Sequence, residues 1–289
     1  MLAFTHIPET VNGSFESILR RSFGIGHCCI IVPKSRRYRP IFAAGELKRT
    51  NRAFPWLASI SGPAIVPFGD LPSAFPDMRF YTFLREPIER CASEFVRQVN
   101  GQVGEDALNA FASWIQQPEV RNRQCLQICG VPDASTAIWR LNENIQFVGL
   151  IERFHESLVL FARWTGNTRV DVRYHLRKQA IESNLKKKLL SNIESRRLLI
   201  EANREDARLY DEVSRNIFPQ QCEDYGDQLE RDVQTFEAFN VPPSRISGEI
   251  LSLIMREVVY RPLSSILVNR TNPTVHVTRI TKPQRRRAA

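Results

Sequence analysis

The sequence has little cysteine for its length and no long apolar run. Six cysteines are spread over 289 residues, whereas small secreted proteins concentrate theirs in a short chain that disulfides hold together. This spacing favours reduced thiols, and with them a cytoplasmic location. No stretch approaches the roughly 18 apolar residues of a membrane-spanning helix. The first residues also lack the basic and apolar segments of a secretory signal, so we expect neither a membrane span nor export.

Lysine is also scarce, because 33 of the 40 basic residues are arginine. The formal net charge is +9, but residues 270–289 hold six basic residues and no acidic one, which leaves +3 for the rest of the chain. Arginine binds phosphate and sulfate through its planar fork, so an anionic ligand is expected. Nucleic-acid binding is not expected, because no aromatic residue lies between the charges of the tail and the body of the chain carries no nucleic-acid-binding motif.

Two common ligand motifs are missing as well. The chain has no GxxxxGK[ST] phosphate loop. Cys125 and Cys129 have neither a second cysteine pair nor nearby histidines that would complete a zinc site. We therefore expect no metal.

The chain does contain the ordinary composition of a globular protein, with 43% hydrophobic and 25% charged residues. Its patterns predict strands at residues 2–7, 28–32, 64–66, 80–84 and 147–150. Helical patterns cover residues 15–21, 88–100, 105–117, 136–143, 152–165, 178–190 and 193–217. Strands that alternate with helices indicate an α/β domain, here a three-layer arrangement of a parallel sheet flanked by helices.

Phe218 and Pro219 are expected to close this periodic region, which predicts three parts. The first is the α/β domain at residues 1–219, the second a helical extension at 220–268, and the third a basic, disordered tail at 269–289. The extension would hold helices at 225–238 and 248–260. The apolar residues of the second helix could cover the body or pair with a second subunit as a homodimer; they are Ile250, Leu251, Ile254, Val258 and Val259.

A first candidate anion site follows the first strand. The loop at residues 8–14 supplies hydroxyls, an amide and small residues before a helix begins. Helix N-termini carry unpaired backbone donors and a positive dipole end, so phosphate or sulfate binds there. The same residues also suit a simple turn in which Asn12 or Ser14 caps the helix.

A second candidate site follows the strand at residues 80–84. Arg85 stands at the end of that strand, and Ser93 comes eight residues later, inside the next helix. Open parallel sheets bind ligands at the carboxyl ends of their strands, where an arginine and a hydroxyl can grip one phosphate. The alternative is a surface arginine paired with Glu89.

Together, in this order, the two units resemble the sulfotransferases that use 3′-phosphoadenosine 5′-phosphosulfate (PAPS), in particular the branch with carbohydrate O-sulfotransferases. That family opens with a loop of type His-Ile-Pro-Lys-Thr-Gly-Gly-Thr-Ser, and residues 6–14 here read HIPETVNGS. Its 3′-phosphate motif, Leu-Arg-Asp-Pro-x-x-Arg with a later Ser, is similar to residues 84–93. Three more stretches resemble family segments, at residues 122–130, 147–158 and 201–218.

The resemblance implies a P-loop-NTPase-like sulfotransferase fold and a sulfuryl transfer from PAPS, as co-substrate, to a hydroxyl of a carbohydrate or another acceptor, without a metal. The residues that it assigns to the donor are Pro8, Thr10, Asn12, Gly13, Ser14, Phe15, Arg85, Ser93, Arg177 and Lys178.

Two departures concern catalysis. Glu9 stands where the family has the lysine that steadies charge on the leaving phosphate, and no histidine precedes the turn Pro67-Phe68-Gly69, where the family often has its base. Three interpretations stay open. The enzyme is active with relocated groups, such as Glu9 or His6 as base and an arginine in place of the lysine; or it binds the nucleotide or a glycan without turnover; or the loop aligns differently with the family.

Overall fold

The computed structural model describes residues 1–11, 13–30, 41–99, 106–166, 170–174 and 184–241, together with Ile254 and Val258. Five parallel strands form one sheet, in the order β2-β3-β1-β4-β5. Their bounds are β1 Leu2–Thr5, β2 His27–Cys29, β3 Ser59–Gly62, β4 Arg79–Leu84 and β5 Ile145–Leu150. The prediction of an α/β fold with a parallel sheet flanked by helices is confirmed.

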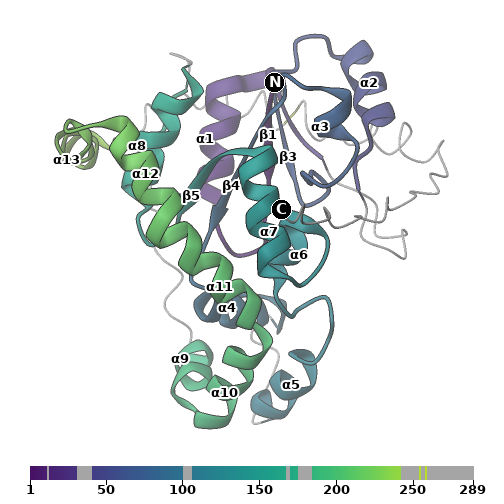
Figure 1. Ribbon diagram of the computed structural model, residues 1–289, viewed down its shortest axis with the longest axis vertical. Coiled ribbons are helices and arrows are strands. Elements are labelled where there is room, and N and C mark those ends of the chain that lie inside the picture. Colours follow the sequence, from purple (N-terminus) through teal and green to yellow (C-terminus); the bar gives the residue numbers. More distant parts are fainter. Residues whose placement is uncertain are drawn as a thin grey trace, which may run out of the picture.

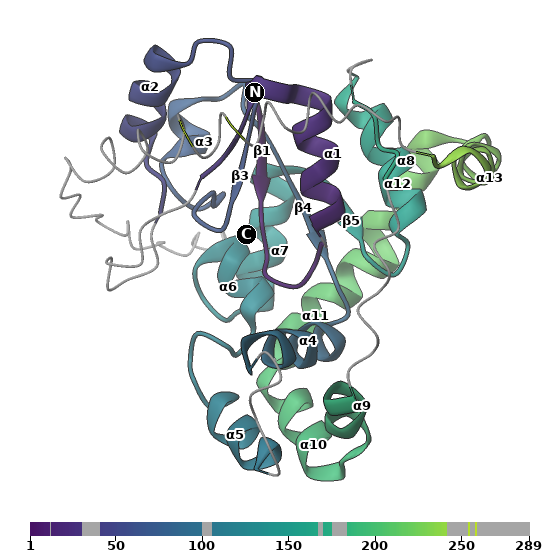
Figure 2. The ribbon, with the colours of Figure 1, turned by 180° about the vertical axis from the view of Figure 1, so that it is seen from behind.

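Helices cover both faces of this sheet (Figures 1 and 2). The α-helices of the first half are α1 Gly13–Phe23, α2 Ala44–Ala53, α3 Leu71–Ala74, α4 Pro87–Val99, α5 Ala107–Trp114, α6 Arg123–Cys129 and α7 Ala134–Asn144. Those of the second half are α8 Phe154–Thr165, α9 Asn184–Ser191, α10 Ile193–Ala202, α11 Arg204–Glu212, α12 Phe218–Tyr225 and α13 Leu229–Phe239. Helix α1 lies on one face and α7 on the other, as right-handed crossovers from β1 to β2 and from β4 to β5 require when they run in opposite directions along the sheet.

An aromatic cluster fills the space between the sheet and helices α1 and α8. Phe4 of β1 stacks on Tyr81 of β4 with ring centroids 5.1 Å apart, and Phe15 of α1 lies 4.6 Å from Phe83. Phe161 of α8 lies 5.3 Å from Phe15. All five rings are fully buried. Stacked, tilted and edge-to-face aromatic pairs add to the free energy gained by burying their large apolar areas, so this cluster stabilises the packing of α1 and α8 on strands β1 and β4.

Gly149 of β5 is part of the same packing. It is the register partner of Phe83 on β4, and a Cβ atom at position 149 would overlap the Phe83 ring. The start of α8 is joined to the same strand, because the Ser157 hydroxyl donates to the carbonyl of Leu150 and accepts from its N–H, both at 2.9 Å. Glycine and serine in this stretch therefore serve the packing of β5 against its neighbours.

A second, smaller core lies beyond the carboxyl ends of the strands, among helices α4, α5, α9 and α10 (Figure 1). The buried rings of Phe95, Phe111 and Trp114 pack against each other there, with Leu189 of α9 and Leu199 of α10 beside them. Helix α4 contributes Phe95 to this core. A different face of the same helix carries Arg90 and Arg97.

The predicted strand at residues 64–66 is wrong. Residues 64–66 are buried but lie in a turn and coil after β3, and the strand is the preceding stretch Ser59–Gly62. Two of its four residues are serines, which gives no apolar signal. Their hydroxyls are buried because they bond the His27 ring on β2, with Ser59 Oγ 3.0 Å from Nδ1 and Ser61 Oγ 3.3 Å from Nε2. Burial lowers the pKa of His27 to about 3, so the ring is neutral at neutral pH.

The expected end of the helical region at Phe218 and Pro219 is also wrong. Helix α11 continues through a π-helical turn at Val213–Ile217 directly into α12, with Pro219 in the first turn of α12. Proline lacks the N–H of a regular helical bond, and both a helix first turn and a π-turn tolerate that loss. The long pattern at 193–217 also divides at Asn203, between α10 and α11.

Helix α12 runs across the predicted boundary between residues 219 and 220, and that division stays a prediction. The basic tail and the homodimer contact through residues 248–260 fall outside the described residues, Ile254 and Val258 excepted. None of the helices in the described part of the chain has the length and apolar character needed to span a bilayer.

Candidate functional site

The order of the strands determines where a ligand site can lie. After β1 the chain crosses to β2 on one side, and after β4 it crosses to β5 on the other side, while β1 and β4 are direct neighbours. Two loops therefore leave the carboxyl edge side by side and diverge. Open α/β sheets bind their ligands at such a switch point. Both candidate anion units of the sequence lie there: Arg85, and the described part of the loop after β1 at residues 6–11, 13 and 14.

The loop after β4 is held by side chains from distant helices. Gln124 of α6 is fully buried and forms two hydrogen bonds with the backbone of Arg85: its Oε1 accepts from the N–H at 3.1 Å, and its Nε2 donates to the carbonyl at 2.9 Å. Glu152, just after β5, accepts from the N–H of Glu86 at 2.8 Å and from the Tyr210 hydroxyl at 2.8 Å. The backbone at Arg85 and Glu86 is thus fixed before any ligand binds.

A buried carboxylate supports Gln124 in turn. Asp206 of α11 has no exposed surface, and its two oxygens accept from the N–H groups of Gln124 and Cys125, at 2.9 and 2.8 Å. Burial raises the pKa of Asp206, while the Arg90 guanidinium and these two N–H donors oppose that rise. Asn122 has the left-handed backbone that asparagine tolerates, with φ 47°, and its Oδ1 accepts from the N–H of Glu205 at 2.9 Å. Stretches 122–130 and 201–218, far apart in sequence, therefore form one scaffold beneath Arg85.

Arg85 itself points toward the neighbouring loop. Its Nη1 donates to the carbonyl of Glu9 at 3.1 Å, and its Nη2 lies 3.8 Å from a carboxylate oxygen of Glu89. Its side chain is 20% exposed. The pairing with Glu89 thus exists, but it is long, and the shorter contact joins the two candidate loops.

The loop after β1 is short of free donors at Thr10. The Thr10 hydroxyl donates to the carbonyl of Ile7 at 2.8 Å, and the Thr10 N–H approaches the same carbonyl at 3.4 Å. The structure places His6 beside Phe4, with the rings stacked at 5.6 Å, and 3.9 Å from a carboxylate oxygen of Glu16. Burial lowers the pKa of His6, and Glu16 opposes this. Helix α1 begins at Gly13, directly after this loop, and the first N–H groups of a helix point toward a ligand at its N-terminus.

Glu9 lies between the arginines that follow β4. Its backbone is left-handed, with φ 63°, which is uncommon for a residue with a Cβ atom. Its carboxylate forms an ion pair with Arg97 Nε of α4 at 2.5 Å, and its side chain is 17% exposed. Burial raises the pKa of Glu9, while Arg97 lowers it. The preceding carbonyl, of Pro8, accepts from Nη1 of the fully buried Arg90 at 3.5 Å.

Ser93 lies on the face of α4 that meets this loop. At about 100° of helix per residue, Arg90, Ser93, Glu94 and Arg97 fall within about 100° of arc, and the two arginines contact the turn at Glu9. Ser93 is half-buried, and its hydroxyl has no hydrogen bond to any residue that the structure describes. It is available to a ligand beside the loop.

The other sequence candidates divide into two groups. Phe15 is fully buried in the aromatic cluster, so it serves the core. Asn12, Arg177 and Lys178 lie outside the described residues.

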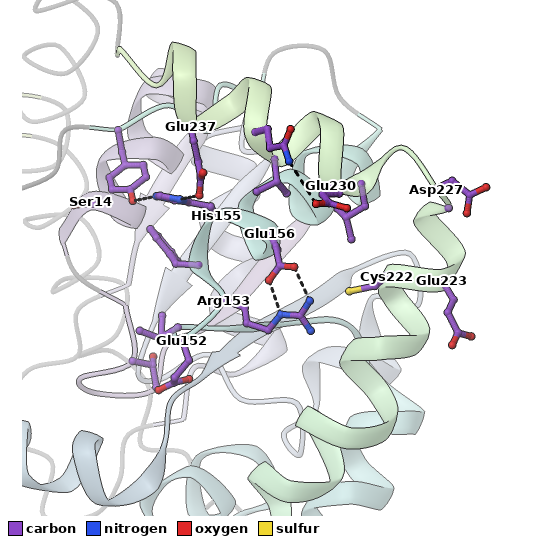
Figure 3. A pocket seen from close by; sticks show the side chains of 18 residues that line it. Ser14, Glu152, Arg153, His155, Glu156, Cys222, Glu223, Asp227, Glu230 and Glu237 are labelled. Atoms are coloured by element: carbon purple, nitrogen blue, oxygen red, sulfur yellow. Dashed lines mark hydrogen bonds and ion pairs between the residues drawn. The ribbon is translucent and has the colours of Figure 1, made fainter.

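A cavity of about 1140 Å³ adjoins the loop after β1. Thr10 and Ser14 line one part of it, and the other walls come from the start of α8, from Tyr174 and from α12 and α13 (Figure 3). Its acidic side chains are Glu152, Glu156, Glu223, Asp227, Glu230 and Glu237. Arg153 is the one arginine among the lining residues and pairs with Glu156. The far part of this cavity therefore repels phosphate, and an anion is favoured only near the loop and α4.

A histidine forms hydrogen bonds across that cavity. His155 Nδ1 lies 2.6 Å from Glu237 Oε1, and its Nε2 lies 2.8 Å from the Tyr174 hydroxyl. Figure 3 shows the contact between His155 of α8 and Glu237 of α13. It joins the α13 helix to the rest of the protein at the edge of the cavity.

Sequence reasoning missed Arg90 and Arg97 as site residues, and it gave Gln124 and Asp206 no role. The signal for the arginines was present, because positions 90, 93 and 97 share one helical face. The roles of Gln124 and Asp206 depend on which helix packs against which loop, and no local pattern contains that information.

No protein-family model matches the chain, and no curated protein matches it.

Proposed function

We propose that the chain binds PAPS at the switch point between β1 and β4 and transfers its sulfuryl group to a hydroxyl of a carbohydrate or another acceptor. The observation that carries the proposal is the meeting of two sequence-distant units, the loop after β1 and the pair Arg85 and Ser93, at the carboxyl edge of neighbouring parallel strands. Ligands of open α/β sheets bind at this place.

The residues present fit a phosphate group. Arg85 has a backbone fixed by Gln124 and a charged fork, and Ser93 offers a hydroxyl without a partner among the described residues. In this proposal they hold the 3′-phosphate, while backbone donors at Gly13 and Ser14 hold the 5′-phosphosulfate. The cavity beside Thr10 and Ser14 would admit the acceptor.

The second candidate is a sulfotransferase homologue that binds the nucleotide or a glycan without catalysing transfer. Glu9 favours this candidate. The Glu9 carboxylate is engaged by Arg97 and does not line the cavity, so it does not face an acceptor there as a base. A negative charge close to a leaving phosphate opposes the electrostatic stabilisation that such a transfer needs.

Calorimetric titration with adenosine 3′,5′-bisphosphate tests the binding part. Arg85→Ala is expected to weaken binding at least tenfold, roughly the contribution of a charged hydrogen bond. Arg197→Ala is the matched control: it removes the same charge from α10, where Arg197 is 62% exposed and pairs with Glu194 and Glu201. Equal affinities of the wild type and Arg85→Ala would refute the assignment of the site.

Transfer of label from PAPS to a panel of glycans separates the two candidates. Activity of the wild type supports the sulfotransferase. Activity that appears only in Glu9→Lys, which puts a cation beside the leaving phosphate, supports a binding protein that has lost turnover.

A further inference from the structure

Three arginines converge on two consecutive residues of the loop after β1. Arg85 donates to the carbonyl of Glu9 at 3.1 Å and Arg90 to the carbonyl of Pro8 at 3.5 Å, and Arg97 Nε forms an ion pair with the Glu9 carboxylate at 2.5 Å. Arg90 is fully buried, and its Nε and Nη2 atoms have no hydrogen-bond partner in the part of the chain that the structure describes. We call the side chains Arg85, Arg90 and Arg97 the arginine cluster.

Each arginine of the cluster has a different acidic partner. Glu94 pairs with Arg90 at 2.6 Å, and Glu89 lies 3.8 Å from Arg85 and 2.5 Å from Lys186. Among the described residues, Arg97 pairs with Glu9 alone. Glu9 is thus the acid that reaches the cluster from the opposite loop, where a ligand anion at the switch point would also lie.

The pair between Arg97 and Glu9 is suited to exchange. Arg97 is 69% exposed, so solvent screens it and ion pairs of this kind contribute little to stability. A phosphate dianion offers the same guanidinium more negative charge than a carboxylate and three acceptor oxygens instead of two, which makes a stronger contact. The left-handed backbone of Glu9, in turn, keeps its carboxylate at the cluster only while the surrounding contacts hold it there.

We propose that the Glu9 carboxylate is a built-in anion that occupies the arginine cluster in the ligand-free protein, and that a phosphate group binds there by taking Arg97 from Glu9. The class of ligand, a phosphate ester, rests on the proposed function; the occupation of the cluster by Glu9 does not. Glu9 therefore lowers the affinity of the site, because every bound phosphate meets a nearby carboxylate that has lost its partner.

The opposite role makes the opposite prediction. If Glu9 served to position Arg97 for the ligand, its removal would weaken binding. If it competes with the ligand, its removal strengthens binding. The sign of one measurement separates the two roles.

The experiment is calorimetric titration of the full chain with adenosine 3′,5′-bisphosphate and, separately, with inorganic phosphate. Glu9→Gln, which keeps the shape of the side chain, is expected to bind each ligand about tenfold more tightly than the wild type, and Arg97→Gln more weakly. The double variant should show non-additivity, because the two residues interact directly. Glu201→Gln is the matched control: Glu201 is an acid of α10 that lies 3.3 Å from Arg121 and 3.8 Å from Arg197, and its removal should change affinity less than twofold.

The outcomes distinguish this inference from the proposed function. Tighter binding of inorganic phosphate by Glu9→Gln, with no nucleotide binding by any variant, upholds the built-in anion and refutes the nucleotide site. Nucleotide binding that is unchanged or weakened in Glu9→Gln refutes the built-in anion and leaves the function standing. No binding of either ligand by any variant refutes both. Circular dichroism confirms that each variant is folded.

Discussion

The loops after β1 and β4 leave the same edge of the sheet, but they are held in different ways. The loop after β4 is fixed by a neutral amide and a carboxylate that bond its backbone, those of Gln124 and Glu152. The loop after β1 is held by arginines that contact its carbonyls and the Glu9 carboxylate. A backbone fixed by buried hydrogen bonds stays in place whatever binds, whereas a loop held by opposite charges responds to an added charge. We therefore call the loop after β4 the platform of the candidate site, because its backbone is fixed. The loop after β1 is the part of the site that responds to an added charge.

The largest expected effect comes from breaking the platform. Gln124→Leu leaves the N–H and carbonyl of Arg85 without their partners, which should cost about 2–4 kcal/mol in the free energy of unfolding and also weaken binding of adenosine 3′,5′-bisphosphate. Gln127→Leu is the matched control: Gln127 is buried one turn later on α6 and donates to the carbonyl of Pro63 at 2.7 Å. It should lose stability but keep its affinity. Denaturant titration measures the free energy of unfolding, and calorimetry measures the affinity for the nucleotide. If both variants lost the same affinity, Gln124 would act on binding only through general stability and not as part of a platform.

A smaller effect tests the backbone of the two loops. Among the described residues other than glycine, Glu9 and Asn122 have positive φ, so Glu86 in the loop after β4 does not. At position 9, glycine should be more stable than alanine by up to about 1 kcal/mol, because only alanine is strained there. At position 86 the order should reverse, because glycine has more freedom to lose on folding. Thermal unfolding of the four variants measures this; the same order at both positions would contradict the left-handed conformation of Glu9.

The last test is the pH dependence of anion affinity. The groups that face Glu9 are Arg85, Arg90, Glu94 and Arg97, with His6 on its own loop. Burial raises the pKa of Glu9 above its ordinary value, so the carboxylate gains its proton at a higher pH than a free glutamate and then stops competing. As pH falls from about 7 toward the ordinary glutamate pKa of about 4.3, wild-type affinity should approach that of Glu9→Gln. The ratio of the two cancels titration of the ligand and of His6; a constant ratio would contradict the prediction.

The sheet was largely predictable, because apolar runs such as Phe80–Leu84 end at turn residues. Strand β3 was not, because its buried serines are paired with a histidine from another strand. Helices α2, α3 and α6 were also missed: α3 and α6 are short, and α2 has few apolar residues in a regular spacing.

Of the candidate site, the sequence indicated Arg85, Ser93 and the loop before α1, since each lies next to a recognisable strand. It did not indicate that Arg97 would meet Glu9. That contact depends on the angle at which α4 crosses the end of the sheet, which is decided by packing against the second core. The same limit applies to Asp206, whose partners are backbone groups 81 and 82 residues away.

Gly149 is a position that the packing of the fold alone requires. Because the Phe83 ring fills the place of its side chain, any other residue there would disturb β4 and β5 whether or not the protein binds a ligand. A stable fold alone is therefore enough to require this glycine. Position 9 has no such constraint from the core, because its side chain contacts the partly exposed Arg97 instead. Substitutions that change activity should therefore be tolerated at position 9 and not at position 149.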